Sequence, residues 1–591
     1  MEQSIVDLIS SSLDSGNYKE AINLSLDVKY TNDLSNHCYE LITAIIGKID
    51  DDTLIIKPSL YGTCETLLNN IVRQVSPEEA LFEFIEQIQV AKNDAQFAIV
   101  LEPVQQLLLK LITKRFRSLE FTLDSVSSYL TSIPVPKHNL EGKERLLIDS
   151  DTNTRRIMKT YSLLYHFYNP LVKEVTNATA NVTSTTKEVL SAFLIGLLGK
   201  PLIYVDLDPV DNPSCEAWKS ASFIIEDLCT LVKNVNKFLE HVELHHKKSL
   251  KTKSMNSLTN NEEKLSPYDH IEKINMTTLS GLFYGIYSGH FEVPDFAVPN
   301  VYSIEYVVHT VLICVIHLLN FVEYGPLAKG ISLCRNILER CQTNTCHTML
   351  TNSIHYNLCQ NLVNIAIYST YETIRKEAVK LISIHINKFE YKGRCMLIKY
   401  ILNNSNHSGM IGYSISLYKN SIEEAFKESA LPDCFTGSQL MGMIKKMCHL
   451  PHGAESDLVE LADQIITTLN LLRYLALKDN LNKTGIKECF TMIEDDYLQK
   501  LRTGLNMSKA HYEVKLMDIQ NSKNLPEEEC NISINVGGNI LDKIPTKNKK
   551  EIIHSALNAF HLIEVAKRRI KRIQSTSTIN RKCHYDEAFN D

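Results

Sequence analysis

Few residues of this chain have the types and spacing that catalysis or metal binding requires. His241 and His245 are four residues apart and would share one helix face, as a metal pair does. The intervening Glu243 is at the wrong position for the metalloprotease motif, and no third ligand is apparent. Cys341, Cys346 and His347 lack the paired cysteine spacing of a zinc site. We interpret the histidines as an exposed helix end and expect no metal site.

The other candidate motifs are equally incomplete. Gly196 and Gly199 are too close together for a phosphate loop, and Pro201 follows Lys200 where that loop needs Ser or Thr. The acidic run from Glu494 to Asp496 is best explained as a solvated helix face. Nucleophile elbow, dinucleotide and kinase signatures do not occur. We therefore predict that the chain is not an enzyme and uses no cofactor.

The composition favours long helices over a sandwich or barrel. The chain has 591 residues, of which 44% are hydrophobic and 22% charged, with only 21 Gly and 17 Pro. So few turn residues suggest helices joined by short connections. Apolar residues recur at helical spacing along most of the chain, without a strict repeat period. We predict an all-α fold, an irregular HEAT/armadillo-like α-solenoid of stacked antiparallel helix pairs.

The pattern along the chain suggests four parts. Residues 1–248 form an N-terminal helical-repeat half, and residues 270–573 form a C-terminal HEAT-like half. The polar segment 249–269 between them is expected to be a flexible linker or loop, because it has few apolar groups to bury. Residues 574–591 are expected to be a disordered tail. Within 524–550, alternating apolar residues and the pair Gly537–Gly538 allow a short hairpin.

Charge and cysteine content limit the environment and the partners. The net charge is -7, without the basic excess of a nucleic-acid binder, so no nucleic acid is expected as a partner. The most apolar stretch, 306–319, is shorter than the ~20 residues of a bilayer span and is expected to be a buried solenoid helix. No membrane association is therefore expected. The scattered cysteines fit a reducing compartment, the cytoplasm, with the nucleus as a second location.

A series of short segments in the second half carries a family resemblance. In order they are LNNSNHSG from Leu402, FTG from Phe435, GAESDL from Gly453, LNLLRYL from Leu469 and GLNMSKAHYE from Gly504. In this order and at these separations the segments resemble the glomulin family, firmly over residues 370–570 and more loosely before them. The resemblance implies a HEAT-like solenoid whose C-terminal half binds the RING domain of the RING-box subunit of cullin–RING ubiquitin ligases, and through it the cullin. It also implies that the chain masks the site of the ubiquitin-conjugating enzyme and so inhibits ubiquitin transfer; the family is linked to immunophilins as well.

A helix expected from Glu455 to Lys478 is the first candidate surface. Its core stripe consists of Leu458, Leu461, Ile465, Leu469 and Leu472, at helical spacing. The opposite side carries the polar residues Glu460, Gln464, Thr467 and Lys478, together with Leu471 and Tyr474. Two large apolar groups on such a side need a partner surface. Packing against the next repeat is the favoured explanation, and contact with the apolar groove of a RING is the other.

Two further segments supply the remaining candidates. Asn406 and His407 belong to a turn in which Ser408 is expected to cap the next helix, and Phe435 is explained as a hydrophobic staple beside the cap Thr436. A polar stretch around residues 506–512 could lie beside the first helix, although His511 could instead be a structural histidine, which is more common than a switch. The predicted RING-binding residues are Asn406, His407, Phe435, Leu471, Arg473, Tyr474, Lys478, Asn506, Lys509, His511 and Tyr512.

Two rival functions remain open at this stage. A general α-solenoid scaffold or adaptor for assembly or signalling complexes would bind through both halves and would leave ubiquitin transfer unchanged. An enzyme of unrecognised type would need polar groups that converge in one pocket, and the sequence displays none.

Overall fold

The computed structural model describes residues 4–111, 115–137, 140–177, 184–207, 215–254, 274–521, 534–536, 539–541 and 550–568. Most of these residues are helical, and neighbouring helices pack against each other in pairs. The predicted all-α solenoid is therefore confirmed. The chain divides into two compact units, one formed by Met1–Arg340 with Thr370–Ile374 and the other by Cys341–Ser369 with Arg375–Asp591.

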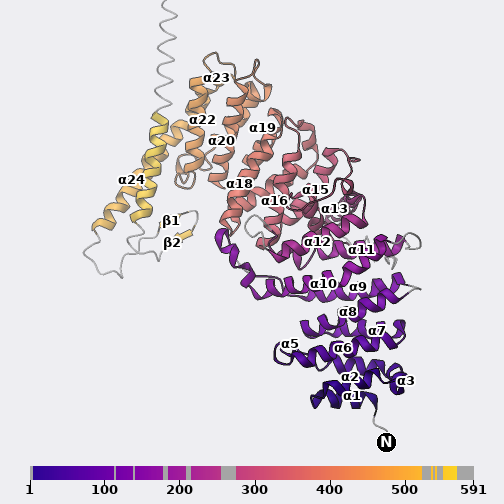
Figure 1. The fold of residues 1–591 in the computed structure, drawn as a ribbon. Helices are drawn as coiled ribbons and strands as arrows, with labels where there is room; N and C mark the ends of the chain where they lie inside the picture. The colour runs from indigo at the N-terminus through magenta and orange to yellow at the C-terminus, as the bar shows by residue number, and fades with distance from the viewer. Residues whose placement is uncertain are drawn as a thin grey trace, which may run out of the picture. The chain divides into compact units, whose positions relative to one another are not determined.

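The first unit is built from helices that pack largely in chain order, such as α7 on α8 and α15 on α16, as Figure 1 shows. The helices are α1 (Ile5–Asp14), α2 (Tyr18–Leu26), α3 (Thr31–Asn36), α4 (Cys38–Ile46), α5 (Thr53–Ile56), α6 (Pro58–Gln74), α7 (Pro77–Val90), α8 (Asp94–Lys110), α9 (Arg115–Ser132), α10 (Thr152–Asn177), α11 (Ser184–Leu197), α12 (Glu216–Leu231), α13 (Leu239–Ser254), α14 (Met276–Tyr287), α15 (Ile304–Leu319) and α16 (Tyr324–Arg340).

Helix α15 shows how an apolar segment becomes a solenoid helix. Its start is capped by Ser303, whose hydroxyl accepts a hydrogen bond from the Tyr306 N–H at 3.2 Å. Apolar residues occupy most of its circumference, and the helix packs against α13, α14 and α16. The predicted buried helix over 306–319 is thus confirmed. In the part of the chain that the structure describes, no helix is long and apolar enough to cross a bilayer.

The start of α16 lies unusually close to the 3-10 turn η3 (Leu202–Tyr204). A Cβ atom on Gly325 would stand 2.2 Å from the Tyr204 carbonyl oxygen, so only glycine allows this approach. One helical turn later, the buried ammonium of Lys329 donates hydrogen bonds to the carbonyl oxygens of Ile203, at 2.8 Å, and of Val205. Gly325 and Lys329 together hold η3 against α16.

The second unit continues the same architecture. Its helices are α17 (Ile354–Tyr368), α18 (Glu372–Asn387, with its first residues in the first unit), α19 (Tyr391–Asn404), α20 (Ser408–Ala425), α21 (Gly437–Met447), α22 (Ala462–Lys478), α23 (Ile486–Ile493) and α24 (Gln499–Asn521), followed by a helix over residues 550–568. Two short strands, β1 (Ile534–Val536) and β2 (Asn539–Leu541), pair antiparallel, so the hairpin allowed by the sequence is present.

The predicted division of the chain stays a prediction. Along the chain, the boundaries between the two compact units fall between residues 340 and 341 and near residues 369–375, rather than in the predicted linker 249–269. Residues 249–254 of the predicted linker form the end of helix α13. Residues 255–269 lie outside the described residues, as does the predicted tail 574–591. Helix α14, which follows the linker, packs against α11 and α12, which precede it.

Candidate protein-binding face

Helices α20 and α22 form the frame of the candidate face, and they pack closely along their length (Figure 1). Small residues recur every four positions on α20, at Ser408, Gly412 and Ser416, which leaves room for α22. A Cβ atom on Gly412 would lie 3.0 Å from the Asp463 carbonyl oxygen. The Ser408 hydroxyl accepts a hydrogen bond from the Gln464 N–H at 3.2 Å. The two helices are thus aligned from their first turns.

Two adjoining hollows lie on the exposed side of this pair, with Tyr474 in the wall of both. The first, of about 400 Å³, is lined by Ile415, Ser416, Lys419, Asn420, Thr467, Asn470, Arg473, Tyr474 and Leu477. The second, of about 490 Å³, is lined by Glu423, Phe426, Lys427, Tyr474, Lys478, Asp479, Asn480, Leu481 and Lys483. We call the residues that line these two hollows the α20–α22 face.

Tyr474 is held in place by its neighbours but stays accessible. The Lys419 ammonium lies 5.2 Å from the centre of its ring, and the Phe426 ring packs at 6.4 Å. Burial and the nearby Glu423 raise the pKa of Tyr474, so the phenol keeps its proton at neutral pH and can donate a hydrogen bond. Beside it, the buried Nε of Arg473 has no hydrogen-bond partner among the described residues. Such a pair of Arg and Tyr side chains is typical of interface anchors.

The α20–α22 face is cationic although the chain as a whole is acidic, with a net charge of -7. The exposed or half-exposed charged side chains lining the hollows are one carboxylate, Glu423, and five cations, Lys419, Lys427, Arg473, Lys478 and Lys483. Asp479 also lines the second hollow but is buried, with 2% of its surface exposed. A surface of this charge favours a partner with acidic groups.

The buried Asp479 shapes the loop that borders the second hollow. Its carboxylate accepts hydrogen bonds from the Lys483 N–H at 2.7 Å and from the N–H and hydroxyl of Thr484 at 2.9 and 2.5 Å. These hydrogen bonds fix the loop that carries Leu481, whose side chain is 80% exposed. An exposed leucine beside Tyr474 gives the cationic face an apolar centre.

The structure corrects part of the predicted surface. Leu471 is fully buried, because α22 packs on more than one side and its buried arc is wider than one stripe. Gln464, also expected on the polar side, is buried and donates to the carbonyl oxygens of Met447 and His449 at 3.4 and 3.3 Å. Phe435 is buried against the rings of Tyr391 and Tyr418. In this fold Leu471 and Phe435 have no surface to offer a partner.

Other parts of the prediction for this helix hold. The core stripe is confirmed for Leu458, Ile465, Leu469 and Leu472, which are all buried. The helix itself is shorter than expected, since α22 begins at Ala462 and residues 453–455 form the separate turn η8 (Gly453–Glu455). Arg473, Tyr474 and Lys478 all line the hollows of the α20–α22 face.

Asn406 and His407 lie at the far end of the same helix pair. Both are exposed, and His407 caps α20 by accepting a hydrogen bond from the Met410 N–H at 3.2 Å on its Nδ1. The expected cap, Ser408, is buried and bonds to Gln464 instead. Twelve residues of helix, roughly 18 Å, separate His407 from Lys419 in the first hollow. The turn therefore does not line the hollows.

The four predicted residues on α24 do not form one surface. Lys509 makes an ion pair of 2.5 Å with Glu564 on the helix over residues 550–568. Lys509 and Arg568 together lower the pKa of Glu564 to about 2. The Tyr512 ring packs against Phe560 of that helix at 5.5 Å. These two side chains support the packing of residues 550–568, whereas Asn506 and His511 are exposed. Partial burial lowers the pKa of His511, with Lys515 as a second cause.

Sequence reasoning missed several residues of the face. Leu481, Leu477 and Phe426 supply its apolar surface, and Lys419 and Lys427 much of its charge. Leu481 carried a detectable signal, because it is a large apolar residue between two asparagines in a loop segment. The residues of α20 carried none, since their position opposite Tyr474 depends on the packing of two helices.

The described helices define an all-α solenoid protein, and comparison with known proteins places it more closely. Residues 314–554 match a family described as an uncharacterised protein family, YAP/Alf4/glomulin. The chain is also similar to glomulin over most of its length. It is 28% identical to human glomulin over 518 residues, which cover 86% of this chain and 83% of that protein. It is 27% identical to mouse glomulin over 530 residues, covering 87% and 85% of the two chains. The resemblance predicted from the sequence is confirmed.

Proposed function

We propose that this chain is a non-catalytic inhibitor of cullin–RING ubiquitin ligases. Its α20–α22 face binds the RING domain of the RING-box subunit and covers the site at which the ubiquitin-conjugating enzyme docks. Ubiquitin transfer then stops because the ubiquitin-loaded conjugating enzyme cannot dock on the ligase. The observation that carries the proposal is the cationic face with an apolar centre, located within the segment that matches the glomulin-containing family.

The chemistry of the face supports binding to a small protein domain. Tyr474, Phe426 and Leu481 offer apolar surface for the apolar groove of a RING, and the cations around them can pair with acidic groups at its rim. Arg473 lines the first hollow, where its guanidinium can pair with a carboxylate of the partner. A standard interface buries about 1,600 Å², more than the two hollows alone provide, so flanking residues contribute to the interface.

The proposed mechanism needs affinity but no chemistry. An inhibitor that competes for one site must bind the RING at least as tightly as the conjugating enzyme at the concentrations present. Excess conjugating enzyme should therefore restore ubiquitin transfer. In this mechanism no part of the chain touches the reacting thioester, and the chain is not consumed.

A reconstituted ubiquitin-chain assay tests the proposal. Neddylated cullin–RING-box complex, conjugating enzyme and substrate are mixed, and the full-length chain is titrated in. We expect inhibition that depends on dose and is relieved by more conjugating enzyme. The variant Arg473→Ala/Tyr474→Ala should raise the inhibitory concentration at least about tenfold, equivalent to about 1.4 kcal/mol of binding free energy. Leu481→Ala should act in the same direction, because its exposed side chain supports little of the fold.

A matched control removes the same residue types elsewhere. Tyr39→Ala/Arg73→Ala truncates an exposed tyrosine and an exposed arginine in the first unit and should leave inhibition unchanged. Circular dichroism checks that each variant is folded. Absence of both binding and inhibition at high protein excess would refute the ligase function and leave an α-solenoid scaffold or adaptor. Full inhibition by the Arg473/Tyr474 variant would place the interface elsewhere.

A further inference from the structure

A loop of the second unit brings potential metal ligands together. Residues 341–353 connect α16 to α17, and Thr345 in this loop forms a parallel bridge with Phe389. The Thr345 N–H donates to the Lys388 carbonyl oxygen at 2.9 Å, and the Glu390 N–H donates to the Thr345 carbonyl oxygen at 3.1 Å. The backbone is therefore fixed immediately before Cys346 and at Glu390, the residue that precedes α19.

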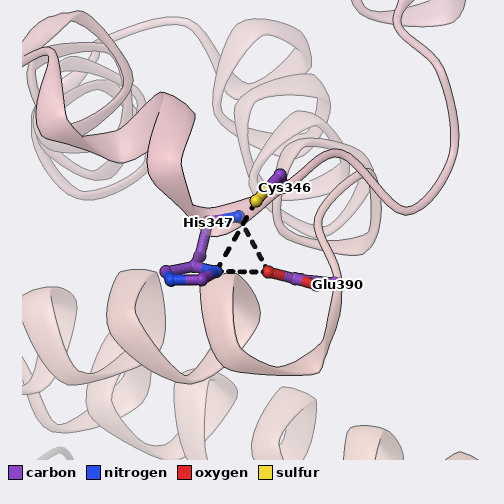
Figure 2. Close-up of side chains that lie close together, drawn as sticks. All are labelled: Cys346, His347 and Glu390. Atoms are coloured by element: carbon purple, nitrogen blue, oxygen red, sulfur yellow. Dashed lines mark hydrogen bonds and ion pairs between the residues drawn. The ribbon is translucent and has the colours of Figure 1, made fainter.

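Three side chains converge where this bridge ends, as Figure 2 shows. The Sγ of Cys346 lies 3.7 Å from the Nδ1 of His347, which is hydrogen-bonded to the Oε1 of Glu390. The same carboxylate oxygen accepts a hydrogen bond from the His347 backbone N–H at 2.9 Å. One ligand atom from each residue lies within 4.8 Å of the other two. Among the described residues, this is the group of Cys, His and carboxylate donors that lies close enough together to hold one metal ion.

The donor types and spacing fit zinc. Zn²⁺ binds thiolate sulfur at about 2.3 Å and imidazole nitrogen or carboxylate oxygen at about 2.0–2.2 Å, so neighbouring ligand atoms around a tetrahedral ion are about 3.5 Å apart. The Sγ–Nδ1 separation already matches that value. The carboxylate of Glu390 is nearer to Nδ1 than zinc would hold it, because the two groups are hydrogen-bonded to each other. A rotation of this partly exposed side chain would open the space for the ion.

We propose that Cys346, His347 and Glu390 bind one Zn²⁺ ion through Sγ, Nδ1 and a carboxylate oxygen, with water in the fourth position. Hard cations such as Mg²⁺ prefer all-oxygen ligands and six-fold coordination, so this site should reject them. The site is independent of the α20–α22 face and of the proposed ligase inhibition.

The alternative is a surface ion pair between His347 and Glu390 in which Cys346 has no role. An ion pair explains the contact between Nδ1 and the carboxylate without the sulfur, so a dependence of metal binding on Cys346 distinguishes a zinc site from an ion pair. When zinc binds, the Cys346 thiol releases its proton and the metal replaces the proton on Nδ1, with the imidazole proton on Nε2. Binding should therefore release protons to the solvent and weaken as the pH falls. It should also cross-link the 341–353 loop to the start of α19 and stabilise the second unit.

Metal titration of the untagged full-length protein, purified with a chelator and then freed of it, tests the proposal. We expect one equivalent of Zn²⁺ to bind in isothermal titration calorimetry, with no binding of Mg²⁺. Co²⁺, used as a spectroscopic substitute, should give a thiolate-to-cobalt charge-transfer band in the near ultraviolet. Cys346→Ala should abolish that band and weaken Zn²⁺ binding at least about tenfold. Because Cys346 is exposed, its replacement should leave the fold intact.

Two further variants keep the test decisive. Glu390→Gln keeps the side-chain shape but removes the anionic ligand, and it should also weaken binding. His241→Asn/His245→Asn removes the histidine pair on α13 and should change nothing. If zinc binds unchanged to Cys346→Ala, or if its binding depends on the α13 pair instead, the proposed site is wrong. Failure of Zn²⁺ to bind at all would also overturn it, and none of these three results bears on the ubiquitin assay.

Discussion

Replacing Lys329 with methionine tests how the first unit tolerates a buried ammonium. Lys329 is 3% exposed and donates to two carbonyl oxygens of the segment that Gly325 also contacts. Burial lowers the pKa of Lys329 from 10.5 to about 7, with Arg145 as a smaller cause in the same direction, while Asp206 and Cys215 act oppositely. The unfolded chain therefore binds more protons than the folded chain between pH 7 and 10.5. Stability should rise with pH across this window.

The magnitude follows from the two pKa values. With a pKa of about 7 in the folded state and 10.5 in the unfolded state, the charged lysine costs about 4 kcal/mol at pH 7 and about 2 kcal/mol at pH 9. Methionine has no charge to bury, but it leaves the carbonyl oxygens of Ile203 and Val205 without this donor. Two opposing effects thus set the sign of the stability difference between wild type and Lys329→Met at any one pH. The pH dependence of that difference comes from the lysine alone.

The assay is urea unfolding of the wild type and of Lys329→Met at pH 7, 8 and 9. Trp218, the single tryptophan of the chain, reports on the first unit, because it stacks on Phe291 and donates to the His290 carbonyl oxygen at 3.1 Å. We expect the wild type to gain about 2 kcal/mol relative to the variant between pH 7 and 9. Lys233→Met, which removes an exposed lysine of the same unit, should show no such trend. A stability difference that stays constant over this range would refute the reasoning.

Four further substitutions test single features of the packing. Burial lowers the pKa of His385 well below 6.5, so the second unit should lose stability as the pH falls below 6.5. The variant His385→Leu should remove that loss of stability. Hydrogen exchange of α18 at pH 7 and 5.5 measures the effect. Gly325→Ala should cost about 1–3 kcal/mol in urea unfolding monitored by Trp fluorescence, because its Cβ would collide with backbone. Gly196→Ala, a helical position with nothing within 4 Å of the added Cβ, should instead be neutral or stabilising. Asp479→Ala should speed hydrogen exchange in the 480–484 loop and weaken RING binding.

Local patterns were enough to predict the helices, because each helix must bury an apolar side whatever it packs against. The segment 306–319 is apolar nearly all round and became the enclosed helix α15. Helix α7 begins at Pro77, a residue type favoured at the first helical position, although the Ser76 side chain makes no capping hydrogen bond. These features depend on residues within one or two turns of each other.

The candidate sites depend on residues that are far apart in the chain. Glu390 reaches His347 across 43 residues, through a backbone bridge that no local pattern announces. The sequence therefore indicated no zinc site at Cys346 and His347. The prediction that Leu471 is exposed was wrong for a related reason. A helical wheel shows one apolar side, whereas a solenoid helix with neighbours on several sides buries a wider arc.

That wide arc also determines how such a protein can recognise a partner. With Ile465, Leu469, Leu471, Leu472 and Leu475 all buried, α22 leaves only a narrow strip of its surface exposed. A partner that contacts Arg473 and Tyr474 on this strip must also contact α20 and the 480–484 loop, which line the same hollows. The proposed interface would therefore be assembled from separate segments held by buried groups such as Asp479. Recognition should depend on the packing of the second unit as much as on the exposed side chains.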